Sequence, residues 1–415
     1  MSDDVYLDAA VGLAREISAA AIWSDERCSW MGGMPEEGPG GEIAMTYASF
    51  GPDLYGGTAG VGLALAEIFA ASGEGDPELR RTALGALEHG LSRADEVPLP
   101  SRLGAYGGQL GIALCAARAG KVLEKPDLHR RAGELVSGLD YETEPVENDL
   151  IGGRAGGILA LLSLRELGVA EATLERAVKL GEDLVGAADR DQAGWSWPST
   201  ASPEGRNLTG LSHGAAGVGV ALLELHRACG EAGFLAAAEE AFAYERSLYD
   251  PQARNWPDLR EHVLRDWPAD AAPPCTTLWC HGAPGIALSR LRACELGDAN
   301  GCEQEARVAL ETTAASLHRQ LPAGNYSLCH GLAGNAEILV EGASLLGEEA
   351  QTLIRGVADA GIERHLETDN PWPLGVHDGQ TDSLLLGRAG TAYFYLRLHD
   401  PARPSLLLLR PESFA

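Results

Sequence analysis

A G-x-x-G step followed by an apolar run recurs seven times in this sequence of 415 residues and restricts the folds open to it. Successive steps start between 45 residues (Gly108 to Gly153) and 68 residues (Gly214 to Gly282) apart, so the repeat has connections of variable length. Repeats of this kind are typical of stacked helical pairs, because one pair cannot bury its apolar face alone. The seven steps begin at Gly57, Gly108, Gly153, Gly214, Gly282, Gly331 and Gly387.

Two kinds of helical segment alternate along the chain. Each step is followed by a segment that is apolar nearly all round, which predicts a helix buried on all sides. Between these lie charged segments with apolar residues at helical spacing, which predict helices that cover a core from outside. We predict buried helices over Val61–Ala71, Ile112–Ala119, Ile158–Leu164, Val218–Leu225, Ile286–Leu291, Ala336–Leu346 and Thr391–Leu398. We predict outer helices over Tyr6–Ile22, Pro77–Asp95, Pro126–Leu139, Ala170–Asp189, Phe234–Tyr249, Glu303–Leu321 and Glu348–Leu366.

This alternation favours an all-α fold, an α/α toroid in which seven inner helices line an axis and seven outer helices surround them. An open solenoid of helical hairpins is the alternative, and its terminal repeats should be polar caps. The last repeat, Leu384–Leu398, is as apolar as the middle ones, so we expect a closed ring. We therefore predict a single domain over residues 1–415, although the length alone would suggest two or three domains. We expect no run of strands.

In a ring, the residues directly before the steps gather at one end of the axis. Glycine fills this position in the first three repeats and histidine in the next three. The change from structural to reactive residue types indicates a functional site at that end. The seven residues are Gly56, Gly107, Gly152, His213, His281, His330 and Leu386.

Two of these histidines directly follow a cysteine, in Cys280-His281 and Cys329-His330. Cys280, Cys329 and His330 offer two thiolates and an imidazole, a donor set that suits zinc. Three protein ligands would leave one tetrahedral position open, although His281 or Cys275 could close it. Buried thiols and a hydrogen-bonded histidine without a metal are the structural alternative. An open position on zinc would hold an external thiol as thiolate, so the site suits the activation of sulfur.

A histidine and an aspartate in neighbouring repeats are candidates for acid–base chemistry. His213 could exchange a proton near neutral pH, and a capping or core histidine is the alternative. Asp149 stands three residues before Gly152 and could orient His213 or exchange a proton itself. An aspartate in a turn is often a turn former, and Asp53 in the matching place of the first repeat supports that interpretation.

Two connections, residues 191–209 and 250–277, are longer and richer in Trp and Pro than the others. Long ordered loops are often functional, so substrate contact, a lid and simple packing are all open interpretations. We expect residues 28–33 and 35–41 to form a further loop.

The charge and the cysteine pattern bear on partners and location. A formal net charge of −28 disfavours nucleic acid and anionic membranes as partners. Eight cysteines without framework spacing indicate reduced thiols. The acidic segment Met1–Asp4 lacks the cationic start of a signal peptide, and no apolar run reaches the roughly 20 residues that span a bilayer. We expect a cytoplasmic protein without membrane insertion.

The motifs at three corners resemble those of the lanthionine cyclase (LanC-like) family, and the resemblance extends over nearly the whole chain. They read Trp279-Cys280-His281-Gly282-Ala283-Pro284-Gly285, Cys329-His330-Gly331 and Gly210-Leu211-Ser212-His213-Gly214. The resemblance implies a toroid of seven plus seven helices with one catalytic zinc. By motif, Cys280, Cys329 and His330 match the zinc ligands. His213 matches the histidine proposed as general acid/base, and Asp149 matches the acidic residue that assists it.

The resemblance also implies a reaction and partners. The family adds a cysteine thiolate of a ribosomally made precursor peptide to dehydroalanine or dehydrobutyrine, which closes a lanthionine or methyllanthionine thioether ring. Zinc activates the thiolate, and an acid protonates the enolate that forms. This chain has no room for a dehydratase, so we expect a separate one. Two alternatives are an enzyme that adds free thiols such as glutathione to dehydroamino acids, and a non-catalytic peptide-binding scaffold with structural zinc.

Two features depart from the pattern of stand-alone cyclases. Residues 275–278 lack the arginine that some of them place before Trp279, so enolate stabilisation is expected to be shared differently. The histidine at position 281 and the segment Tyr393–Leu398 look more like the cyclase domains of bifunctional synthetases.

Overall fold

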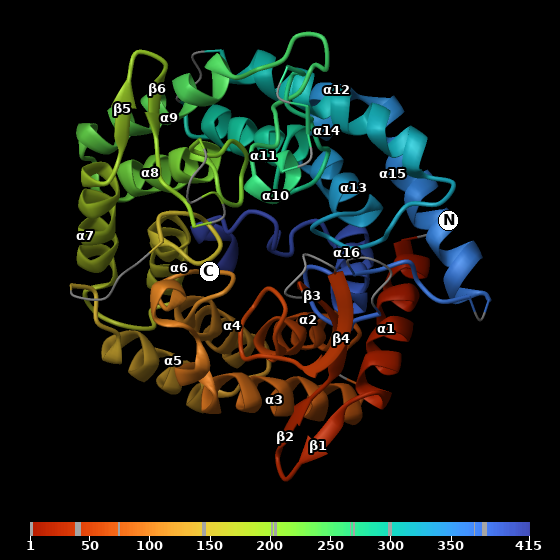
Figure 1. Ribbon diagram of the computed structural model, residues 1–415. Coiled ribbons are helices and arrows are strands. Elements are labelled where there is room, and N and C mark those ends of the chain that lie inside the picture. The colour runs from red at the N-terminus through yellow and green to blue at the C-terminus, as the bar shows by residue number, and fades with distance from the viewer. Residues whose placement is uncertain are drawn as a thin grey trace.

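The computed structural model describes residues 3–37, 43–73, 75–142, 147–200, 202, 206–265, 267–268, 270–297, 301–368, 370–375 and 380–415. Within these ranges the helices form two concentric rings around one axis (Figure 1). The inner ring consists of α2 (Thr58–Ala71), α4 (Gln109–Val122), α6 (Arg154–Glu166), α8 (Ala215–Cys229), α11 (Ala283–Glu295), α13 (Leu332–Glu341) and α16 (Arg388–His399). The outer ring consists of α1 (Asp3–Ala19), α3 (Pro77–Ser92), α5 (Pro126–Gly138), α7 (Thr173–Gly186), α9 (Ala232–Ser247), α12 (Cys302–Gln320) and α15 (Glu348–Gly361).

Short helical turns lie in the connections and at the end of the chain. Two are α-helical, α10 (Glu261–Leu264) and α14 (Ala343–Leu346). Three are 3-10 turns and one, directly after α15, is a π-helical turn. They are η1 (Ala94–Glu96), η2 (Leu99–Ser101), η3 (Ile362–Leu366) and η4 (Pro411–Phe414).

The side chains of the two rings explain their positions. In α2 every residue from Thr58 to Phe69 is buried, as expected for a helix that is apolar nearly all round. The outer helix α7 buries Ala177, Leu180 and Leu184 on one face and exposes charged residues on the other. Each outer helix packs against the inner helix of its own hairpin, which buries that apolar face.

The ring is closed, so the toroid prediction is confirmed and the open solenoid is wrong. Each inner helix contacts the next one, and α16, the last, contacts α2, the first. The outer helix α1 packs on α16, which joins the two ends of the chain (Figure 1).

Backbone hydrogen bonds connect the seven corners, the turns that precede the inner helices, into a cycle. Each corner donates to the next across 2.8–3.2 Å, and the seventh donates to the first. The cycle fixes the order of the corners around the axis, so those of His213, Cys280 and Cys329 are consecutive. The donors are Leu54 and Tyr55 to Tyr106, Tyr106 and Gly107 to Ile151, Leu150 to Ser212, Ser212 to Cys280, Trp279 to Cys329, Cys329 to Leu385, and Leu385 to Tyr55.

The second glycine of each step lets the helix begin directly against its own corner. A Cβ atom on Gly334 would lie 1.7 Å from the carbonyl oxygen of Leu328, and one on Gly111 would lie 1.6 Å from that of Ala105. In the other five steps the same clash falls on the carbonyl six residues earlier. No side chain fits at this position, so the repeated glycine is a steric requirement of the corner.

The expectation of no strands is wrong. Six short strands in the described residues form three antiparallel hairpins, and residues 28–33, expected as a loop, lie largely in two of these strands. Of residues 35–41, positions 35–37 are strand and 38–41 lie outside the described residues. Strands of three residues show no alternation, and glycines and a proline disguise a longer one. The pairs are β1 (Ile22–Ser24) with β2 (Arg27–Ser29), β3 (Met31–Glu37) with β4 (Ile43–Ser49), and β5 (Asp189–Asp191) with β6 (Gly194–Ser196).

Two observations bear on the environment of the protein. All eight cysteines are free thiols. In the described part of the chain, every helix is too short or too polar to cross a membrane.

Candidate metal and acid–base site

Three donor atoms converge where the fifth and sixth corners of the ring meet. The sulfurs of Cys280 and Cys329 and a ring nitrogen of His330 lie within 4.8 Å of one another. The N–H of Trp279 donates to the carbonyl of Cys329 across 3.0 Å, which holds the two corners together. Both cysteines are buried, whereas His330 is partly exposed, so the cluster is reached from the side of the imidazole.

The donor set fits a zinc ion. Two sulfurs and one imidazole nitrogen at this separation can contact one cation, and soft thiolates favour zinc over hard cations such as magnesium. Neither His281 nor Cys275 joins the three donors within the described residues. A tetrahedral ion held here would therefore keep one position for an external ligand.

The pKa values of the two thiols of this cluster shift in opposite directions. The hydrogen bond from Cys329 holds the pKa of Cys280 well below its ordinary value, and the His330 side chain acts in the same direction. Burial raises the pKa of Cys329 instead. These opposite shifts favour ionisation of Cys280 over that of Cys329, and a cation that displaced the thiol protons would be held by two sulfurs.

His213 and Asp149 form a hydrogen-bonded pair beside this cluster. Nδ1 of His213 lies 2.5 Å from Oδ2 of Asp149, so the carboxylate accepts the Nδ1 proton and leaves Nε2 to exchange protons. Burial alone would lower the pKa of His213, but the hydrogen bond and charge of Asp149 outweigh it and the pKa is raised. The His213 side chain is 27% exposed and Asp149 only 8%, so the histidine is the member that a substrate can reach.

His281 stacks on His213 and lies outside the group of three donors. The ring centroids are 5.9 Å apart, with 27° between the planes. His281 is fully buried, which lowers its pKa to about 4 and keeps it neutral. Neither ring nitrogen has a hydrogen-bond partner among the described residues, and Nδ1 lies 4.0 Å from Oδ1 of Asp258. The neutral His281 ring therefore covers one face of the His213 ring.

Arg260 brings a positive charge to the site from the long connection 250–277. Its Nε and Nη2 donate to the two oxygens of Asp258 at 2.9 and 2.6 Å, a two-point contact that fixes the guanidinium. Asp258 is fully buried and also accepts from the hydroxyl of Thr276 at 3.3 Å. Burial tends to lower the pKa of Arg260, but the hydrogen bond and charge of Asp258 outweigh it, and the charges of Cys280 and Cys329 add to this rise. The charge of Arg260 in turn tends to lower the pKa of Cys329.

Arg260 could not be predicted from the repeat, because it lies in a loop outside it. The motifs indicate only that residues 275–278 lack an arginine. Thr276, within that stretch, is hydrogen-bonded to the carboxylate that fixes Arg260. Arg260 thus lies about sixteen residues earlier in the chain than Thr276 and contacts the same carboxylate.

Tyr55 was also missed, although the repeat held a signal for it. It stands two residues before the first glycine of its step, the position that Cys280 and Cys329 occupy in theirs. Its hydroxyl hydrogen-bonds with Cys329 and tends to lower the pKa of that thiol. Burial raises the pKa of Tyr55 well above its ordinary value, so it stays a neutral donor.

Two of the four tryptophans of the two long connections are buried. Trp197 is buried and donates to the carbonyl of Leu184 at 2.7 Å, and Trp256 is buried against Tyr249. Trp267 is 44% exposed. Packing is thus the role of the two buried rings, and the contribution of connection 250–277 to the site is Arg260.

A buried glutamate supports the corner of His213 from the outer ring. Oε1 of Glu245, on α9, accepts from the N–H groups of Gly210 at 3.0 Å and Ala216 at 2.8 Å. These bonds satisfy backbone donors at the start of α8. Burial raises the pKa of Glu245 to about 7.

The fold and this cluster define an α/α toroid with two thiols and an imidazole at one end of its axis and a histidine–aspartate pair beside them. The chain belongs to the lanthionine synthetase C-like protein family, whose model matches residues 48–408.

Individual relatives share the length of the chain at low identity. The zebrafish (Danio rerio) protein named glutathione S-transferase LANCL1 is 23% identical over 370 residues, which cover 85% of this chain and 84% of that protein. The structure of nisin cyclase superposes with a TM-score of 0.62 at 19% identity, over 87% of this chain and 91% of its own. The Lin0763 protein from Listeria innocua superposes with a TM-score of 0.52 at 10% identity, over 94% and 96%. The structural likenesses establish a shared fold.

Proposed function

We propose that this protein is a zinc-dependent peptide cyclase that adds cysteine thiols to dehydroalanine or dehydrobutyrine and so forms lanthionine or methyllanthionine rings. The observation that carries the proposal is the convergence of Cys280, Cys329 and His330 with the His213–Asp149 pair at one end of the toroid. Membership of the lanthionine synthetase C-like family and the fold shared with nisin cyclase support it.

Cys280, Cys329 and His330 are the residues that would hold the zinc. When bound, zinc lowers the pKa of a thiol that ligates it, so such a thiol reacts as a thiolate near neutral pH. His330 is partly exposed and the two cysteines are buried, so a substrate would approach past the imidazole.

His213 is the proton donor in the proposed reaction. The substrate sulfur attacks Cβ of the dehydroamino acid, and the π electrons move onto Cα and the neighbouring carbonyl as an enolate. His213 then transfers its Nε2 proton to Cα, while Asp149 holds Nδ1–H and stabilises the imidazolium before the transfer. The proton lost by the substrate thiol restores His213, so product and substrate have the same mass.

Arg260 would stabilise the enolate. A guanidinium fixed by two hydrogen bonds presents its positive charge without reorganisation, which favours a developing negative charge in a partly buried site. In this proposal Arg260 supplies the charge that residues 275–278 lack.

The proposal implies two partners. The substrate is a ribosomal precursor peptide whose Ser or Thr residues have been dehydrated, and a separate dehydratase would supply it. Eight free thiols suit a reducing compartment, so we infer a cytoplasmic location.

A second candidate is the addition of a free thiol such as glutathione to a dehydroamino acid. The likeness to a protein named glutathione S-transferase LANCL1 over 85% of this chain favours it. The two reactions share the same chemistry at the site and differ in whether sulfur and acceptor belong to one molecule.

One experiment separates these functions. The zinc-loaded protein is incubated with a peptide that contains one dehydroalanine and one cysteine, with and without glutathione. A cyclase gives loss of the alkylatable thiol without change of mass, whereas a transferase gives a mass increase of one glutathione. His213→Asn should retain zinc and slow either reaction by about 10²- to 10⁴-fold. A third outcome, no reaction and no change in the absorption of the Co²⁺ form on adding the peptide thiol, would indicate a scaffold with a structural metal.

A further inference from the structure

Residues 403–414, here called the axial segment, run through the centre of the toroid. In Figure 1 this part of the chain lies at the centre of the ring, surrounded by the inner helices. Leu406–Leu409 and Phe414 are at most 1% exposed, so the segment fills the axis with apolar side chains. A segment in this position can contact every inner helix at once.

The axial segment does contact all seven inner helices. Six contacts are hydrogen bonds or ion pairs, and the seventh is the packing of η4 on α6. Most of the partner side chains lie in the second half of their helices, at the end of the ring opposite the corners. The six polar partners are Glu67 on α2, Arg118 on α4, Arg227 on α8, Arg292 on α11, Glu341 on α13 and Tyr393 on α16.

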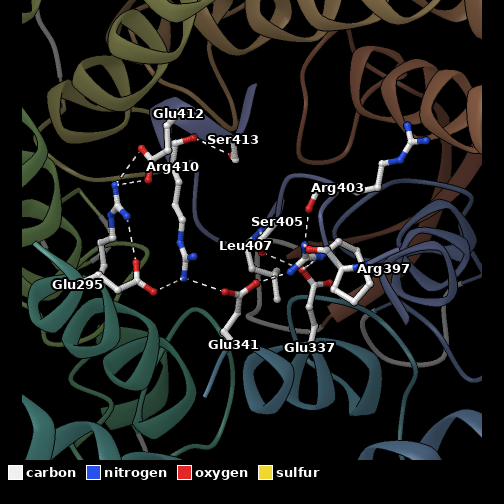
Figure 2. A network of polar contacts seen from close by, with 12 residues as sticks. Glu295, Glu337, Glu341, Arg397, Arg403, Ser405, Leu407, Arg410, Glu412 and Ser413 are labelled. Atoms are coloured by element: carbon white, nitrogen blue, oxygen red, sulfur yellow. Dashed lines mark hydrogen bonds and ion pairs between the residues drawn. The ribbon is translucent and has the colours of Figure 1, made fainter. Parts of the chain in front are cut away.

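Ion pairs and a hydrogen bond anchor the axial segment at that opposite end (Figure 2). Arg410 donates to Glu341 at 2.7 Å and lies 3.3 Å from Glu295, so it joins α13 to α11. Ser405 donates to Glu337 at 2.7 Å. Glu337 and Glu341 are largely removed from water, so removing the partner of either one leaves a buried charge and is costly. The segment is therefore held in one position along the axis.

From this anchored position the axial segment reaches the corners. The carbonyl of Leu407 accepts from the indole Nε1 of Trp279 at 2.8 Å. The carbonyl of Leu406 accepts from the hydroxyl of Tyr106 at 3.1 Å, and the rings of Tyr106 and Trp279 lie 5.3 Å apart. The axial segment thus lies against two corners. The corner of Trp279 carries a donor thiol, and the corner of Tyr106 does not.

Trp279 links the axial segment to both cysteines of the candidate metal site. It directly precedes Cys280, and its backbone N–H donates to the carbonyl of Cys329. Its side chain is fully buried and its indole N–H is satisfied by Leu407. The position of Trp279 therefore determines how far the Cys280 corner lies from the axial segment and how far it lies from the Cys329 corner.

We propose that the axial segment positions the Cys280 sulfur through the hydrogen bond between the Leu407 carbonyl and Trp279, so that metal affinity depends on a backbone carbonyl at the axis. This inference rests on the proposed function, because it requires that the site holds a metal. Trp279 is a positioning residue in this arrangement. Residues that orient metal ligands typically change affinity by 10- to 100-fold when they are altered.

The test compares Trp279→Phe with Tyr106→Phe. Both variants remove one hydrogen bond to adjacent carbonyls of the same segment, but only the first lies at a corner with a donor sulfur. Ser405→Ala is a second variant that leaves Trp279 intact. The Ser405 hydroxyl accepts from the N–H of Leu407 at 3.3 Å. Its removal therefore leaves the backbone of Leu407, whose carbonyl accepts from Trp279, less firmly held. Co²⁺ affinity is measured by competition with a chelator, and folding is followed by thermal unfolding of the same samples.

We expect Trp279→Phe to weaken Co²⁺ binding by about 10- to 100-fold, Ser405→Ala to weaken it by less, and Tyr106→Phe to leave it within about threefold. The proposal is overturned if Trp279→Phe binds Co²⁺ like the original protein, or if Tyr106→Phe loses affinity to the same extent. Absence of Co²⁺ binding in the unaltered protein would instead refute the metal site of the proposed function.

Discussion

Asp149 and His213 belong to adjacent corners of the ring, 64 positions apart in the sequence, and their side chains meet at 2.5 Å. The other oxygen of Asp149 accepts from the N–H of Gly152 at 2.8 Å, the bond of a turn former. Asp53 makes the same turn bond to Gly56 at 2.8 Å. One carboxylate oxygen of Asp149 therefore makes a turn hydrogen bond and the other contacts His213, an arrangement compatible with both the turn role and the orienting role.

Asp149→Asn should separate these two roles. An asparagine oxygen can still accept from Gly152, so the corner is retained, but the negative charge on Nδ1 of His213 is lost. The pKa of His213 should then fall, because Asp149 is what raises it. We expect cyclisation near pH 7 to slow by about 10²-fold and the decline of rate at high pH to begin at a lower pH, measured as a pH–rate profile.

Asp53→Asn is the matched control for this variant. It changes the same turn position in the first repeat, where the carboxylate accepts from N–H groups of its own turn, that of Gly56 at 2.8 Å. The rate and its pH profile should stay as in the unaltered protein. Equal losses in both variants would assign Asp149 to the turn alone.

The repeat spacing accounts for much of what the sequence could predict. Seven glycine steps predicted the closed ring, and the residues before them brought Cys280, Cys329 and His213 to one end of the axis. Arg260 could not be predicted, because it enters the site from a loop whose path depends on the buried carboxylate of Asp258. Tyr55 could have been found, because it occupies the same position in its repeat as the two cysteines.

Cys329→Ala should abolish zinc binding and cyclisation together. The substitution leaves one thiol and one imidazole, and it also removes the group that lowers the pKa of Cys280. Cys115→Ala is the control, since Cys115 is equally buried but packs within α4. Zinc content after gel filtration, measured by elemental analysis, should be about one per chain in the control and near zero in Cys329→Ala. Stoichiometric zinc in Cys329→Ala would remove this residue from the ligand set.

Glu245 should make the stability of the protein depend on pH. Its pKa in the folded state is about 7, above the ordinary value of 4.5, so the folded protein binds more protons than the unfolded chain between these values. Its contribution to the free energy of unfolding is therefore fully present below about pH 4.5 and decreases as pH rises to about 7, by an amount on the order of 3 kcal/mol.

Glu245→Gln removes this titration and retains an oxygen for the N–H groups of Gly210 and Ala216. Urea unfolding of both proteins at several pH values should show a stability difference that moves in favour of glutamine between about pH 4.5 and 7. A constant difference over that range would show that Glu245 ionises normally in the folded protein.

Arg260→Gln should slow the chemical step without loss of zinc. The variant removes the positive charge and keeps a side chain that can still bond with Asp258. We expect a decrease in kcat on the order of 10²-fold, with Arg260→Lys intermediate because lysine restores the charge but not the two-point contact.

The positive charge of Arg260 also tends to lower the pKa of His213, so its loss should move the decline of rate to higher pH. That direction is opposite to the one expected for Asp149→Asn. Arg254→Gln is the control, because Arg254 lies in the same connection but pairs with Glu311 at the surface, and its substitution should change neither kcat nor the profile. A full rate in Arg260→Gln would assign the residue to holding the loop alone.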